Sequence, residues 1–168
     1  MRHRTLRLLS LVLLLSALSA CSSITDFVIV NDSGSPVEVR YTFKRGYRQE
    51  QCCSYRPAKK PLAKLEDGDV RWGEVPAEGF TYDPGAGAVT LTLGPGEALR
   101  VFEGLNWGGH GDVHNDENFA VESVRITGAN GVVQYEGKQA QYQFQWHDDS
   151  LYRLTYYGWG DKRDGRGS

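Results

Sequence analysis

VEVRYTFK, residues 37–44, is a segment in which every second residue is apolar. A period of two is that of a β-strand, in which successive side chains point to opposite faces. The stretch is therefore predicted to be a strand with one face in the core and the other in solvent. Its apolar positions alternate with polar ones throughout: Val37, Val39, Tyr41 and Phe43 against Glu38, Arg40, Thr42 and Lys44.

Turn-forming residues flank this strand and recur further along the chain. NDSGSP, residues 31–36, joins it to an earlier apolar run at residues 24–30, and the two runs are predicted to form a β-hairpin. GPG, residues 94–96, separates the alternating run at 89–93 from a second apolar pair, Leu99 and Val101. These two runs are likewise predicted to be partner strands.

The C-terminal half repeats the alternating pattern. In the run 119–127 the apolar parity slips, which predicts a β-bulge near Glu122 and Ser123. GANG, residues 128–131, predicts a hairpin turn before the run 132–135. Further strands are predicted over QYQFQW, residues 141–146, and over residues 152–156.

About eight or nine short strands with almost no helix predict an all-β fold, an antiparallel β-sandwich over residues 24–157. A transmembrane barrel needs strands of ~9–11 residues, longer than most of these runs. Residues 56–82 show no clear periodicity and are expected to be a long loop, with one helical turn near 61–66. Residues 158–168 are rich in Gly and charge and are expected to form a flexible tail.

The N-terminus has the pattern of an export signal. Three arginines within residues 1–7 precede an apolar stretch at 8–18, which is shorter than the ~20 residues that a membrane span requires. Residues 1–20 are therefore predicted to be a signal peptide. The stretch ends in LSAC, residues 18–21, which resembles the lipobox of bacterial lipoproteins. Ordinary cleavage after Ser19 or Ser22 is the alternative, and it leaves a free periplasmic protein.

The resemblance implies lipidation of the Cys21 thiol, cleavage before this residue and acylation of the new N-terminus, with fatty acids such as palmitate. Two or more acyl chains hold a protein stably on a bilayer. Residues 21–23 are then lipid attachment and a short tether. In this family, Asp at the position after the lipidated cysteine favours retention in the inner membrane, and this chain has Ser22 at that position. The expected location is the outer membrane, facing the periplasm.

Charge and size narrow the function further. The 168-residue chain has 19 Lys and Arg against 21 Asp and Glu, and residues 1–20 hold three of the Arg and no acid, so the mature net charge is −5. This balance argues against a nucleic-acid partner. A chain of this size buries ~68–70% of its unfolded surface, so a single domain is expected.

The two cysteines other than Cys21, Cys52 and Cys53, are adjacent in sequence. A relaxed disulfide needs Cα atoms ~5.5–6 Å apart, whereas neighbours across a trans peptide lie ~3.8 Å apart. The pair is therefore expected either to close a strained vicinal disulfide or to stay reduced and buried.

A Gly-rich segment is the candidate metal site. At spacing two it carries His110, Asp112, His114 and Asp116, which in extended chain share one side. Imidazole and carboxylate suit Zn²⁺, Mn²⁺ or Ni²⁺, and His147 is a further candidate ligand. The alternative is a polar surface loop whose side chains hydrogen-bond their own backbone and hold no cofactor.

No complete catalytic motif is found, which favours a non-catalytic binding or structural module anchored to the membrane and contacting an envelope protein or a glycan. One alternative is a metal-dependent hydrolase at the 110–116 segment. Another is a glycan-binding lipoprotein, since Trp72, Trp107 and Trp159 lie in Gly-flanked segments, and exposed tryptophans can stack on sugar rings or anchor a partner.

Overall fold

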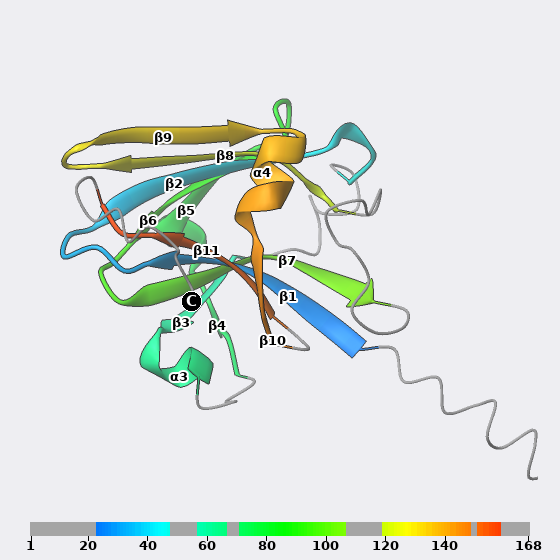
Figure 1. Ribbon diagram of the computed structural model, residues 1–168. Helices are drawn as coiled ribbons and strands as arrows, with labels where there is room; N and C mark the ends of the chain where they lie inside the picture. The colour runs from blue at the N-terminus through cyan, green and yellow to red at the C-terminus, as the bar shows by residue number, and fades with distance from the viewer. Residues whose placement is uncertain (1–22, 48–56, 67–70, 107–118, 149–150, 159–168) are drawn as a thin grey trace, which may run out of the picture.

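The computed structural model describes residues 23–47, 57–66, 71–106, 119–148 and 151–158. Two sheets pack face to face, so the predicted all-β sandwich is confirmed (Figure 1). The described residues form eleven strands rather than eight or nine. Three of the eleven, β3, β4 and β5, begin in the stretch 56–82, in which the sequence showed no periodicity.

We call the two sheets A and B. Sheet A has the order β10 (Gln145–Asp148), β11 (Leu151–Tyr156), β1 (Ser23–Asn31), β7 (Glu97–Asn106), β3 (Ala58–Pro61) and β4 (Gly73–Glu74). Sheet B has the order β5 (Phe80–Asp83), β6 (Ala88–Leu93), β2 (Val37–Phe43), β8 (Val121–Gly128) and β9 (Gly131–Glu136). β1 and β11 pair in parallel, whereas the other described pairs are antiparallel.

In the described residues, four short helical segments accompany the sheets: η1 (Arg45–Tyr47), α3 (Ala63–Glu66), η2 (Ala77–Gly79) and α4 (Lys138–Gln143). α3 lies within the helical turn predicted near 61–66. Its Leu65 is buried in a small cluster with Val28, Val30, Ala98 and Leu151. α3 therefore covers part of the face of sheet A that points away from sheet B (Figure 1).

The main core lies between the sheets. The strand at 37–44 behaves as predicted, because Val37, Val39, Tyr41 and Phe43 are each at most 2% exposed. Opposite them, Phe27 of β1 is the centre of an aromatic cluster. Its ring lies 5.3–5.9 Å from four other rings, those of Phe102, Phe119, Phe144 and Tyr152.

Two local predictions are confirmed in sheet B. Thr42 lies opposite Ser123 and Phe43 opposite Val121, so Glu122 is the extra residue of a β-bulge. The hairpin turn at 128–131 joins β8 to β9, with Gly128 opposite Gly131.

The hairpin predicted from residues 24–43 is wrong, and so is the pairing of 89–93 with 99–101. β1 belongs to sheet A and β2 to sheet B, and β6 and β7 are divided in the same way. The reason is physical: alternation shows which face of a strand is buried, and the two sheets share one core. A strand that follows a turn can bury its apolar face in two ways. It can pair with the preceding strand in the same sheet, or it can join the other sheet and face the preceding strand across the core.

Asn31 forms hydrogen bonds in both connections, the one at 31–36 between β1 and β2 and the one at 94–96 between β6 and β7. Its side chain is fully buried, and its Nδ2 donates to the carbonyl oxygens of Ser35 (2.9 Å) and Leu93 (3.0 Å). Its Oδ1 accepts from the backbone N–H and the hydroxyl of Ser33 (3.1 and 2.6 Å). Its carbonyl oxygen accepts from the N–H of Gly96 (2.8 Å). One amide thus bonds within the 31–36 connection and to the end of β6.

Asn31→Ala is expected to lower the free energy of unfolding by about 2–3 kcal/mol, because buried carbonyl oxygens lose their donors and a buried polar group without a partner costs ~1–3 kcal/mol. Urea denaturation measures the loss. The control is Asp32→Ala, an exposed neighbour whose backbone N–H, not its side chain, bonds to Tyr156. Equal midpoints for the two variants would contradict this role of Asn31.

The strand predicted over residues 141–146 is wrong in its first half. α4 ends at Gln143, and only Gln145–Asp148 forms a strand. Ala140, Gln141 and Phe144 face inward, while Tyr142 and Trp146 are 46% and 56% exposed. Ala, Lys and Gln are good helix formers, and α4 carries the chain from the β9 edge of sheet B to the β10 edge of sheet A (Figure 1).

Candidate functional site

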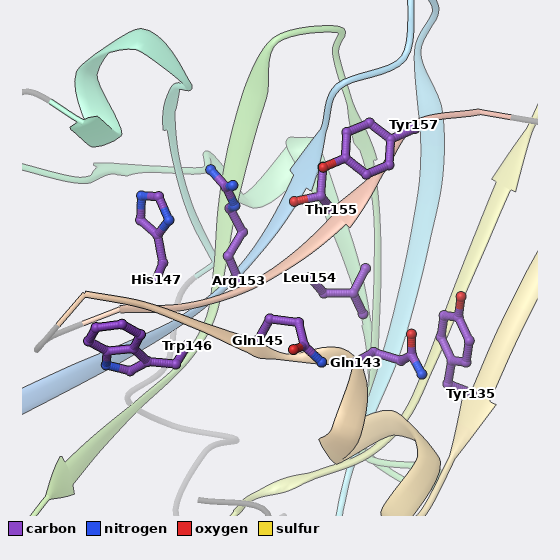
Figure 2. Close-up of a pocket in the computed structure, with 9 residues that line it drawn as sticks. All are labelled: Tyr135, Gln143, Gln145, Trp146, His147, Arg153, Leu154, Thr155 and Tyr157. Atoms are coloured by element: carbon purple, nitrogen blue, oxygen red, sulfur yellow. The ribbon is translucent and has the colours of Figure 1, made fainter. Parts of the chain in front are cut away.

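An open groove of about 250 Å³ lies at the edge of sheet A, where the chain leaves α4 and enters β10. Figure 2 shows the side chains that line it. They come from β9, from the end of α4, from β10 and from β11 with the residue after it: Tyr135, Gln143, Gln145, Trp146, His147, Arg153, Leu154, Thr155 and Tyr157.

The groove exists because β10 covers only part of β11. The pairing runs from Leu151 to Arg153, and no described strand flanks residues 154–156 on that side. The carbonyl oxygen of Tyr156 accepts from Asp32 N–H, so it points toward β1. Since successive residues of a strand direct their backbone groups to opposite sides, the N–H and C=O of Thr155 point toward the groove.

A β-bulge places His147 at the groove. Trp146 lies opposite Tyr152 and Asp148 opposite Leu151, so His147 is an extra residue on the edge strand. Bulges re-aim side chains and are frequent beside functional sites. In Figure 2 the side chains of His147 and Arg153 extend in the same direction, from adjacent strands.

The lining combines exposed aromatic rings with neutral polar groups. Trp146 and Tyr157 are 56% and 40% exposed, which is unusual for side chains of this size in a folded domain. Gln145 is fixed by a bond from its Nε2 to the carbonyl oxygen of Tyr142 (2.7 Å) and keeps its Oε1 as an acceptor. Gln143 and Thr155 add further donors and acceptors.

Arg153 brings a positive charge to the groove. It is half-buried, and among the side chains that the structure describes none pairs with its guanidinium or accepts a hydrogen bond from it. The described residues that line the groove include no Asp or Glu.

Trp72, a sequence candidate for sugar stacking, is half-buried and engaged within the protein. Its Nε1 donates to Asp26 Oδ2 (2.9 Å), and its ring lies 4.4 Å from Lys60 Nζ and 5.4 Å from the Arg100 guanidinium carbon. Arg100 Nη1 also lies 3.6 Å from Asp26 Oδ1. These contacts favour a structural role for Trp72 on the outer face of sheet A.

Burial and the neighbouring side chains act in opposite directions on the pKa of the Asp26 carboxyl. Burial raises the pKa of its carboxyl above the ordinary value, because the charged form loses solvation. The neighbouring Arg100 and the hydrogen bond from Trp72 act in the opposite direction and offset this only in part. The carboxyl is therefore part of the scaffold, and it lies outside the groove.

Most residues singled out in the sequence lie outside the described ranges. This holds for Cys21, for Cys52 and Cys53, for the metal candidates His110, Asp112, His114 and Asp116, and for Trp107 and Trp159. Within the ranges that the structure describes, no three His, Cys, Asp or Glu side chains are grouped as a metal site requires. In the same part of the chain no helix is long and apolar enough to cross a bilayer.

Sequence reasoning named His147 only as a further metal ligand, a prediction that stays untested, and it did not single out Trp146 or Arg153. Both lie in segments that were predicted to be regular strands. The available signal was QWHDD, residues 145–149, in which an aromatic residue is followed at once by ionisable ones.

Comparison with family models, with curated proteins and with solved structures finds no match for this chain. The function is therefore argued from the groove and from the N-terminal sequence.

Proposed function

We propose that this chain is a lipid-anchored binding module of the bacterial cell envelope, and that the groove beside β10 and β11 takes one unit of a glycan. The observation that carries the proposal is the lining of the groove. It presents exposed aromatic rings next to amide, hydroxyl and backbone groups, with no carboxylate among the described residues that form it.

The chemistry of a sugar suits this lining. A pyranose ring has an apolar face of C–H groups, which packs on an aromatic ring, and a rim of hydroxyl groups that need hydrogen-bond partners. Trp146 and Tyr157 offer the rings, while Gln143, Gln145 and Thr155 offer the partners. Tyr and Trp are the side chains that combine apolar area with a polar group.

The size of the groove favours a small ligand over a protein strand. Pockets for drug-sized ligands measure ~300–1,000 Å³, and this one measures about 250 Å³. Strands are usually ~5–6 residues long, whereas the part of β11 that no described strand covers on this side is shorter, residues 154–156. A single sugar unit fits both the volume of the groove and the length of the uncovered part of β11.

The N-terminal sequence supports the proposed location. The LSAC set at 18–21 resembles a lipobox, and β1 begins at Ser23, two residues beyond the cysteine. A sandwich with so short a tether would lie close to the outer-membrane leaflet, on the periplasmic side, within reach of peptidoglycan and lipopolysaccharide sugars.

Trp146→Ala is expected to weaken saccharide binding more than tenfold, as truncation of a central aromatic contact does at binding sites. The probes are monosaccharides and disaccharides from peptidoglycan and lipopolysaccharide. The measurement is saturation transfer in NMR from the mature protein to the sugar protons. The control is Tyr142→Ala, which removes a comparably exposed ring that does not line the groove. Absence of transfer to every sugar, or equal effects of both variants, would overturn the proposal.

A further inference from the structure

The described side chains that line the groove include basic groups and no acidic one, and this asymmetry points to the kind of sugar the groove takes. Arg153 brings a permanent positive charge, and His147 stands on the adjacent strand as a second nitrogen donor. None of the described lining residues is acidic. The mature chain as a whole is acidic, with a net charge of −5, so the basic character belongs to the groove and not to the surface in general.

The position of Arg153 is set by the sheet. It lies opposite Gln145 in β10 and beside Val28 in β1, in the interior of β11 rather than in a loop. Its side chain is half-buried against these strands. Among the side chains that the structure describes, no carboxylate forms an ion pair with it. A guanidinium held in this way is partly desolvated, and desolvation strengthens its interaction with an anion.

We infer that the groove selects an acidic saccharide, one whose ring carries a carboxylate or a phosphate monoester. This inference rests on the proposed function and names its ligand class. The Arg153 guanidinium offers the planar pair of N–H donors that matches such a group in a bidentate fashion. His147, placed beside it by the bulge in β10, donates to the same group or to a neighbouring hydroxyl. Tyr157, which lies on the same side of β11 as Arg153 in Figure 2, packs against the ring that carries it.

The test compares sugars that differ in one group. The pairs are glucuronate with glucose, N-acetylmuramate with N-acetylglucosamine, and glucose 6-phosphate with glucose. The acidic member of at least one pair is expected to bind the mature protein about tenfold more tightly, the usual scale of one charge-assisted contact. A rise from 50 to 500 mM NaCl is expected to reduce this preference, because screening lengths shorten from about 14 to about 4 Å.

Arg153→Gln is expected to abolish the preference and to leave the affinity for the neutral sugar within about twofold. Arg153→Lys retains the charge without the planar fork and is expected to keep part of the preference for the acidic sugar. The control is Arg125→Gln, which removes an exposed arginine of β8 that does not line the groove. Circular dichroism verifies that each variant is folded.

The outcomes separate the two proposals. Equal affinities for the acidic and neutral members of all pairs would overturn the inference and leave the glycan-binding function intact. A preference that persists in Arg153→Gln would overturn the role of Arg153. Binding of neither kind of sugar would overturn the proposed function itself.

Discussion

Phe27→Ala is expected to lower the free energy of unfolding by about 3–5 kcal/mol, the usual cost of truncating a buried Phe. Phe27 is 5% exposed and contacts four other rings, one stacked at 5.3 Å and three tilted or edge-on. Aromatic pairs add ~0.5–1.5 kcal/mol beyond the area they bury. The rings belong to β1, β7, β11 and the segments beside β8 and α4, so several elements lose contacts together.

The measurement is thermal unfolding followed by circular dichroism, in which the melting temperature is expected to fall by roughly 10 °C for a domain of this size. The control is Phe80→Ala in β5, an edge strand where the ring is only partly buried. Its loss is expected to be less than half as large. A melting temperature for Phe27→Ala within about 2–3 °C of the unsubstituted protein, ~1 kcal/mol, would show that this cluster does not organise the core.

Cys21→Ser is expected to abolish lipid attachment altogether. Lipidation requires the thiol, and the hydroxyl of serine does not replace it. Without acyl chains the protein loses the anchor that two or more chains supply, whereas a single chain gives only ~10⁴ M⁻¹ of membrane affinity. The primary measurement is incorporation of labelled palmitate in a bacterial host, together with the mass of the mature N-terminus.

The matched control is the double variant Cys52→Ser, Cys53→Ser, which removes the other two thiols of the chain and is expected to keep the label in full. Label that persists in Cys21→Ser would be incompatible with the lipoprotein assignment. So would an unsubstituted protein whose mature N-terminus carries no lipid and begins at Ala20 or Ser23, the residues that ordinary cleavage after Ser19 or Ser22 would leave first.

Local patterns predicted the strands well, because burial of one face is recorded directly in the sequence. The run 37–43 and the turn at 128–131 are examples, and the slip of parity predicted a bulge near Glu122 and Ser123, where the extra residue is Glu122. Which strands pair with one another was harder to predict. Nothing in NDSGSP at 31–36 distinguishes a turn within one sheet from a connection between two, because the buried amide of Asn31 bonds to Leu93, 62 positions away.

The candidate site was harder to predict than the fold for a related reason. The groove depends on where β10 stops covering β11, and this is set by the end of α4 at Gln143. The alternation of QYQFQW at 141–146 is that of a strand and did not indicate this helix. Burial of Phe144 is compatible with either conformation. The strand predicted over 141–146 would put Trp146 on the same face as Phe144, and the strand over 152–156 gave no sign that Arg153 lines a groove.

The parallel pairing of β1 with β11 has a consequence for how the molecule forms. The first described strand finds its neighbour in the last, with Asp26 opposite Leu151 and Asn31 opposite Tyr156. Contacts between such distant parts of a chain slow folding, since the intervening loop must be closed first. A polypeptide that is delivered N-terminus first, as the proposed export requires, therefore cannot complete this sheet until residues 151–156 have emerged. The first strand stays without this neighbour while more than a hundred intervening residues follow it.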